Sequence, residues 1–250
     1  MAQSQVVLIA VQGVGGAQAV AIRRVLAATH SDERPGLAMS LRNLAAWLSE
    51  LGRREDARAA AEEATGIYRQ LAAASSGPDD ELRSGLAASL NNLSNVLAGL
   101  ERRKEALAAA EEAFAIRQKL AASRPDEFRP DLAGAHYTLA GLLGDMGRRE
   151  EALAATEKAA RAYRELATAR PDEFRPRLAM ALNVLAFRLG DLGRREEALV
   201  AIEEAVAIRK ELALRWPHAH QGELQRSRQI AARLERGEDL SDASLREAWG

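Results

Sequence analysis

The chain has 250 residues, which is long enough to bury a hydrophobic core without disulfide bonds. It contains no cysteine, which excludes cysteine nucleophiles, thiol redox chemistry and cysteine-ligated zinc. The 35 basic and 36 acidic side chains nearly cancel, which argues against a broad surface for nucleic acid. No apolar run approaches the roughly 18 residues that span a bilayer, so we expect a cytoplasmic protein that does not bind membranes.

One short motif recurs four times along the chain. It reads LGRREDA, LERRKEAL, MGRREEAL and LGRREEAL, starting at Leu51, Leu100, Met146 and Leu192, at intervals of 49, 46 and 46 residues. The three extra residues of the first interval fall in the turn-forming stretch 75–79. Such a period predicts an array of helical units. The expected parts are a degenerate half-repeat over 1–35, four hairpins over 36–77, 78–125, 126–171 and 172–217, and a polar cap over 218–250.

The amino-terminal segment precedes the first full unit. Residues 21–28 match the end of a second helix, so we expect the chain to start inside a degenerate unit. The apolar run 6–11 and the glycines of 13–16 resemble a nucleotide-binding loop only weakly, because Gln18 replaces the third glycine. A signal peptide cleaved after 17–19 is disfavoured by the absence of Lys or Arg at its start. We favour an eroded helix that packs on the first hairpin, or a scar left where a larger repeat protein was cut.

Within a unit, apolar residues follow the three- and four-residue steps of helices. In the third unit Leu132, Leu139 and Met146 lie on one helix, and Gly147 is expected to end it. A second helix should start near Arg148. No unit shows the alternation expected of a strand.

A Pro-Asp-Glu-Phe-Arg-Pro segment follows the second helix at 125–130 and again at 171–176. Because proline cannot continue a helix, we expect each segment to be a rigid connector. Its phenylalanine, Phe128 or Phe174, should fill the seam between neighbouring units.

These hairpins resemble the tetratricopeptide repeat, in particular the extended variety of kinesin light chains and many actinobacterial repeat proteins. The resemblance covers residues 37–216 and implies an all-α, right-handed solenoid of antiparallel hairpins. The family pattern has a leucine with a small residue, a turn glycine and two alanines on the second helix. Turn glycines are present in the first, third and fourth units, and Glu101 stands in place of the glycine in the second unit. The matching leucines are Leu44, Leu93, Leu139 and Leu185, and the turn glycines are Gly52, Gly147 and Gly193.

The carboxyl-terminal segment 222–234 aligns with a first helix but carries polar residues at formerly apolar positions. A polar outer face is what the end of a repeat array requires. Ser241 is expected to cap a last short helix that carries Leu245 and Trp249.

Candidate chemistry is sparse. His218 and His220 supply only two metal ligands and are expected in a solvated connector, while His136 is expected to pack in a groove or seam. Glutamate pairs recur in every unit, which favours a structural role, because an active site is needed only once. The Arg-Arg pairs at the turns are expected to be solvated and balanced by following glutamates. We therefore expect no enzyme and no cofactor or metal.

A partner is expected on the exposed positions of the first helices. Asparagine is an unfavourable residue inside helices, yet several flank the leucines, and an amide can donate to and accept from a peptide backbone. Asn91-Asn92-Leu93 is similar to the peptide-gripping motif of kinesin-light-chain-type repeats. Tyr137 and Phe187 could anchor apolar side chains, with room left by Gly141 and Gly144. The candidate residues are Arg42, Asn43, Asn91, Asn92, Asn95, Tyr137, Thr138, Asn183 and Phe187.

The function predicted from these features is a scaffold or adaptor that holds an extended peptide or partner protein. One alternative is a sensor or regulatory fragment of a signalling ATPase or protease encoded elsewhere. Another is self-association through the apolar segment 6–11, which could cover the open end of a neighbouring molecule.

Overall fold

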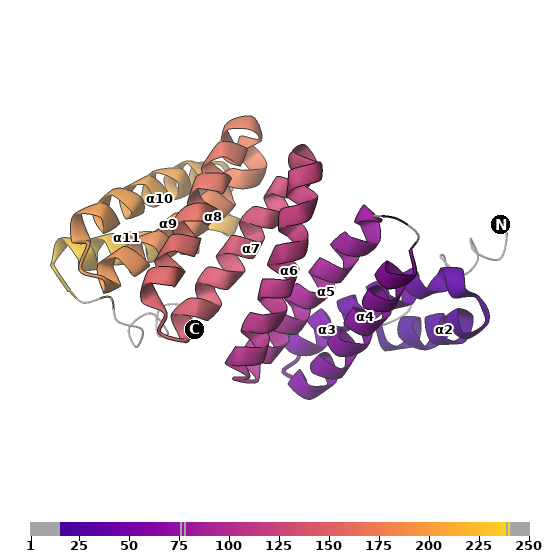
Figure 1. The fold of residues 1–250 in the computed structure, drawn as a ribbon. Helices are drawn as coiled ribbons and strands as arrows, with labels where there is room; N and C mark the ends of the chain where they lie inside the picture. The colour runs from indigo at the N-terminus through magenta and orange to yellow at the C-terminus, as the bar shows by residue number, and fades with distance from the viewer. Residues whose placement is uncertain (1–15, 76, 78, 239, 241–250) are drawn as a thin grey trace. The chain divides into compact units, whose positions relative to one another are not determined.

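The computed structural model describes residues 16–75, 77, 79–238 and 240, and every regular element in that part of the chain is a helix. The all-α class predicted from the repeats is therefore confirmed (Figure 1). The elements are α2 (Gly16–Thr29), η1 (Ser31–Glu33), α3 (Arg34–Glu50), α4 (Arg54–Ala74), α5 (Asp80–Gly99), α6 (Arg103–Ser123), α7 (Pro125–Asp145), α8 (Arg149–Ala169), α9 (Pro171–Asp191), α10 (Arg195–Arg215) and α11 (Pro217–Glu235).

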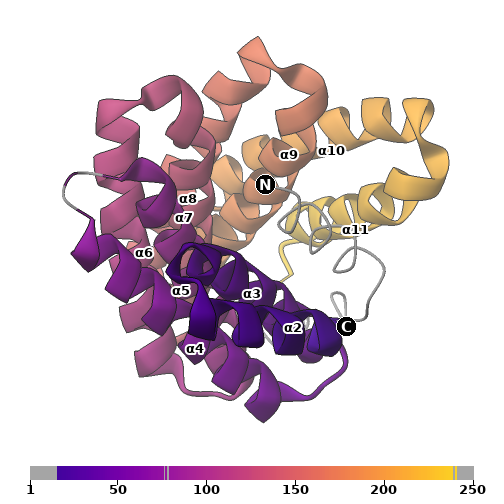
Figure 2. The ribbon, with the colours of Figure 1, turned by 90° about the vertical axis from the view of Figure 1, so that its right-hand side faces the viewer.

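The helices divide into two compact units, Met1–Pro125 and Asp126–Gly250. In the first unit α2 packs on α3, α3 on α4, α4 on α5 and α5 on α6; Figure 2 shows α2, α3 and α4 side by side. In the second unit α8 packs on α9, α9 on α10 and α10 on α11. Each unit is thus a stack of antiparallel helical hairpins, the architecture of a tetratricopeptide-like solenoid.

The turns inside the hairpins have the predicted left-handed residue. Gly52, Gly147 and Gly193 have φ angles of 73, 73 and 74°. Glu101 takes the same place in the second hairpin with φ 59°, a conformation that costs a residue with a Cβ about 1–2 kcal/mol. At each turn the next amide bonds back to the first helix, as Arg148 N does to Leu143 O at 2.9 Å. The repeat therefore imposes the backbone of the turn even where the glycine is missing.

The two segments expected to be connectors are helical, and that expectation was wrong. Residues 125–130 and 171–176 form the first turns of α7 and α9. A proline at the first position of a helix loses nothing, because its N–H would have had no intrahelical partner. Phe174 is fully buried, with its ring 6.5 Å from that of Tyr163 on α8, so it does fill the seam between hairpins.

The interior is built from leucines against alanines. In the first unit one core cluster joins Leu41 and Leu48 of α3 to Ala57 and Ala61 of α4. In the second, Phe174 and Leu182 of α9 pack with Ile202 of α10 and surrounding alanines. Small residues at these contacts let helix backbones approach closely while leucines fill the remaining space.

The ends of the described chain are helical as well. Helix α2 contains the predicted second-helix residues 21–28, and α11 contains the predicted first-helix residues 222–234. Leu224, Ile230 and Leu234 of α11 are buried. The apolar run 6–11 and the short helix expected after Ser241 lie outside the described residues.

Candidate functional site

The leucines expected to pack on each first helix lie at the edge of the packed face, where Leu44, Leu93 and Leu185 contact the core clusters. Leu44, Leu93, Leu139 and Leu185 are only half-buried. The fully buried leucines lie three residues earlier, and the small residue after each half-buried leucine is fully buried too. The line of fully buried residues is therefore displaced around the helix from the line of expected leucines by less than a quarter of the circumference. Positions three and four residues apart lie on the same face of a helix. The buried leucines at this earlier position are Leu41, Leu90 and Leu182.

In the first unit the candidate residues come together on α3 and α5. Asn43 and Asn95 are exposed, and Arg42, Asn91 and Asn92 are half-buried. The Asn92 amide nitrogen donates to the Arg42 carbonyl oxygen at 3.3 Å, which joins the two helices. The Asn92 amide is therefore engaged in a contact between the two helices. Asn43 and Asn95 are the candidate residues of this unit that solvent reaches most fully.

In the second unit the candidates divide into two pairs. Tyr137 and Thr138 on α7 are half-buried. Asn183 and Phe187 on α9 are buried, with exposed fractions of 3% and 6%, so the expectation that they face solvent was wrong. Ser227 on α11 donates its hydroxyl to the Asn183 side-chain oxygen at 3.0 Å. Helix α11 packs on α9 as a further first helix, and this contact takes Asn183 out of reach.

The two glycines expected to leave room near these aromatic residues differ. A Cβ at Gly141 would meet nothing within 4 Å, whereas one at Gly144 would lie 1.9 Å from a guanidinium nitrogen of Arg188. The space beside Gly144 is thus filled by Arg188 of the neighbouring first helix.

An ion pair missed by the sequence analysis lies beside Tyr137. Arg209 of α10 is buried, with an exposed fraction of 4%, and its guanidinium bonds to the Glu223 carboxylate of α11. Burial lowers the pKa of Arg209, and the Glu223 charge opposes that shift. Burial likewise raises the pKa of Tyr137, against the opposing charges of Arg209 and Arg188. The pairing could not be read from the sequence, since the same position of the repeat is tyrosine in α4 and α8 and arginine in α6, and the partner Glu223 belongs to the last helix.

The histidines are placed differently from expectation in one case. His218 and His220 lie in the first turn of α11 instead of a connector, and His220 contacts the Glu223 carboxylate at 3.1 Å. Burial, followed by the charge of Lys158, lowers the pKa of His136 on α7. Within the described part of the chain, no three His, Cys, Asp or Glu side chains are grouped so as to hold a metal ion.

The Arg-Arg pairs at the turns have structural partners. The first arginine of each pair bonds the acidic residue three positions later, as Arg148 does with Glu151 at 2.7 Å. In the second unit the second arginine of each pair reaches the end of the next first helix: Arg149 pairs with Asp191 at 3.0 Å, and Arg195 donates to the Leu234 carbonyl at 2.6 Å. These contacts orient successive hairpins, and the predicted balance by following glutamates is confirmed.

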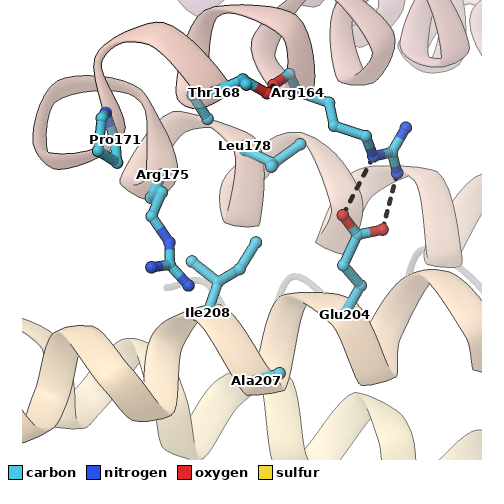
Figure 3. Close-up of a pocket in the computed structure, with 9 residues that line it drawn as sticks. Arg164, Thr168, Pro171, Arg175, Leu178, Glu204, Ala207 and Ile208 are labelled. Atoms are coloured by element: carbon cyan, nitrogen blue, oxygen red, sulfur yellow. Dashed lines mark hydrogen bonds and ion pairs between the residues drawn. The ribbon is translucent and has the colours of Figure 1, made fainter.

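A crevice opens on the side of the second helices in the second unit (Figure 3). It has a volume of about 410 Å³ and lies among α8, α9 and α10. Arg164 and Glu204 close one side through paired bonds of 3.1 and 2.7 Å. Arg175, on the other side, is paired with Glu211 at 2.5 Å. Both arginines are thus already engaged, and the remaining wall is largely apolar, with Leu178 and Ile208 among its residues.

No helix in the described ranges is both long enough and apolar enough to cross a bilayer.

Comparison with known families agrees with this architecture. Residues 37–75, 86–124 and 178–213 match a family model described as a tetratricopeptide repeat, and residues 129–171 match that of anaphase-promoting complex subunit 5. The chain therefore belongs to the tetratricopeptide repeat family. No curated protein sequence matches it.

Three solved structures show the same fold. BtubC (BKLC) from P. vanneervenii aligns with a TM-score of 0.70 and 18% identity, over 93% of this chain and 86% of that one. A kinesin-light-chain-like protein with nearly identical TPR-like repeats, from Podosopora anserina, aligns with a TM-score of 0.61 and 23% identity, over 86% of this chain and 93% of that one. The apo form of RapI aligns with a TM-score of 0.66 and 13% identity, over 97% and 78%.

Proposed function

We propose that the protein is an interaction module that binds an extended peptide of a partner protein on the first-helix surface of its first unit. The observation that carries the proposal is the grouping of Arg42, Asn91 and Asn95 on two helices joined by the Asn92–Arg42 hydrogen bond. The bond fixes the distance between the two helices that carry the polar groups, so that a smaller loss of conformational entropy accompanies binding. Peptide amides and carbonyls find both donors and acceptors in the asparagine side chains.

One structural relative is described as having the TPR-like repeats of a kinesin light chain, and this likeness supports an interaction role. Tyr137 and Thr138 of the second unit are half-buried and are proposed as additional contacts. Asn183 and Phe187 would require α11 to move and are left out of the primary surface. Self-association through the apolar segment 6–11 is the alternative to the intramolecular contact proposed below, and the mass of the protein distinguishes the two.

A peptide-display selection on the intact protein tests the proposal. Selected peptides should lose affinity roughly tenfold for the Asn91→Ala/Asn95→Ala variant, because two amide contacts of about 0.5–1.5 kcal/mol each are removed. The matched control is Gln118→Ala, which removes an exposed amide from second helix α6. Asn92 is left intact because it joins α3 to α5. Equal affinities for the double variant, the control and the original protein would refute the assignment.

A further inference from the structure

Helix α3 presents an exposed apolar face. Met39, Asn43 and Trp47 are spaced by four residues and therefore lie in one stripe along the helix. Met39 is 43% exposed and Trp47 51% exposed. The stripe contains no charged side chain. Large apolar side chains exposed together on one helix face are characteristic of a contact surface.

The repeat shows what kind of contact this stripe makes. The corresponding stripe on α5 is Ala88, Asn92 and Val96, and it packs on α3, the preceding first helix. Val96 is 3% exposed and belongs to a core cluster with residues of α3, and Asn92 donates to a backbone carbonyl of α3.

Helix α11, the final first helix in the described chain, shows the same arrangement. Ile230 and Leu234 of α11 are at the corresponding positions, are each 3% exposed and belong to a cluster with residues of α9. Each of these helices thus uses the stripe to contact the first helix before it. In the described residues no first helix precedes α3, because α2 corresponds to the second helix of a hairpin.

The chain just before α2 is within reach of the stripe. Helix α2 packs on α3 and joins it through residues 30–33, so the two run antiparallel and Gly16 lies near the end of α3 that carries Trp47. From Met39 to Trp47 the stripe is about 12 Å long at 1.5 Å per residue. Val11 lies five positions before Gly16, and five residue steps can span up to about 17 Å. The run 6–11 is Val-Val-Leu-Ile-Ala-Val, as free of charge as the stripe itself.

We propose that the Met39–Asn43–Trp47 stripe is the docking site of the apolar segment 6–11 of the same chain. The contact removes Met39 and Trp47 from water, which is its main driving force. Asn43 occupies the position of Asn92 and donates its amide to a backbone carbonyl of the segment, as Asn92 does to Arg42. The proposal does not depend on the proposed function, and it assigns Asn43, one of the predicted peptide contacts, to the docking of the segment instead.

Tryptophan fluorescence tests this contact. The background variant Trp216→Phe/Trp249→Phe leaves Trp47 as the one indole in the chain. Deleting residues 1–12 from this background should shift the Trp47 emission to the red and raise its quenching by acrylamide roughly twofold, because the indole gains contact with water. The full-length variant Val7→Asp/Ile9→Asp should give the same change without shortening the chain. Gln3→Asp/Gln5→Asp, which adds equal charge at polar positions, should not.

The mass of the protein completes the test. An emission that is independent of protein concentration, with a monomeric mass, supports docking within one chain. If the difference in Trp47 emission between the full-length and shortened chains disappears on dilution, and the full-length protein has a dimeric mass, the stripe binds a second copy and the proposal is overturned. Identical spectra for the full-length background and the shortened chain would overturn it as well. Far-ultraviolet circular dichroism of each variant verifies that the helices are retained.

Discussion

Single residues decide how the repeats of this chain differ from one another. Arg209 is the clearest example, because a buried guanidinium is costly unless its charge is balanced. Its counterion, Glu223, belongs to α11, so the last helix is held on α10 by a charge as well as by apolar contacts. The Nε of Arg209 is buried without a hydrogen bond, which leaves this guanidinium only partly satisfied.

Replacing Glu223 with glutamine should therefore lower the free energy of unfolding by about 1–2 kcal/mol, since it removes the counterion of the buried Arg209 while Glu223 itself is partly screened by solvent. Urea unfolding followed by circular dichroism measures the effect. The control Glu197→Gln removes the partner of the exposed Arg194 and should change stability little. A loss no greater than that of the control would show that the buried pair contributes nothing to the attachment of α11.

His136 is the second informative residue. It stands on α7 at the position where α3, α5 and α9 carry the buried leucines Leu41, Leu90 and Leu182. Burial lowers its pKa below the ordinary value of 6.5. The unfolded chain then binds a proton more readily than the folded one as the pH falls. Any stability due to the neutral imidazole is full above pH 6.5 and is lost as the pH falls below it.

The variant His136→Leu should remove this acid-side loss and raise stability by on the order of 1 kcal/mol through added apolar burial. Thermal unfolding of both proteins across the pH range around 6.5 gives the comparison. Parallel pH profiles for the two proteins would contradict the role assigned to His136.

At the scale of the helical element, the turn between the two helices of a hairpin is the most regular feature. Glu101 adopts the left-handed backbone that glycine supplies in the other three hairpins. Glu101→Gly should stabilise the protein by about 1 kcal/mol, because it relieves the Cβ penalty without altering the turn. The reverse change, Gly147→Glu, should destabilise it by a similar amount. Differential scanning calorimetry measures both, and a fall in the melting temperature of the Glu101→Gly variant would contradict this interpretation.

The sequence predicted these elements well because the repeat multiplies each local signal. The helical spacing and the turn glycines each recur, and the structure confirms both. The helix starts at Pro125 and Pro171 were misread, because proline both ends one helix and begins the next. The burial of Asn183 escaped prediction because it depends on α11, whose polar composition hid its packed face. Tertiary contacts of this kind join residues far apart in the chain and produce no periodic pattern in the sequence.

At the scale of the whole molecule, arginine–glutamate pairs join successive second helices. Arg24 pairs with Glu63, Arg69 with Glu112 and Arg164 with Glu204. In the same register the repeat places Gln118 and Lys158, which cannot form such a pair. Specific side-chain pairing, added to the shared hairpin pattern, thus distinguishes the seams within each unit.

Site-specific crosslinking tests the proposal that the first-helix surface of the first unit binds an extended peptide. Photoreactive p-benzoylphenylalanine is introduced at exposed Asn95 on α5 in one protein and at exposed Gln118 on α6 in another. Each is irradiated with a peptide selected on the unmodified protein. The account predicts a crosslink from position 95 that excess unlabelled peptide suppresses, and none from position 118. Crosslinking from position 118 alone would place the partner on the second-helix side and contradict the account.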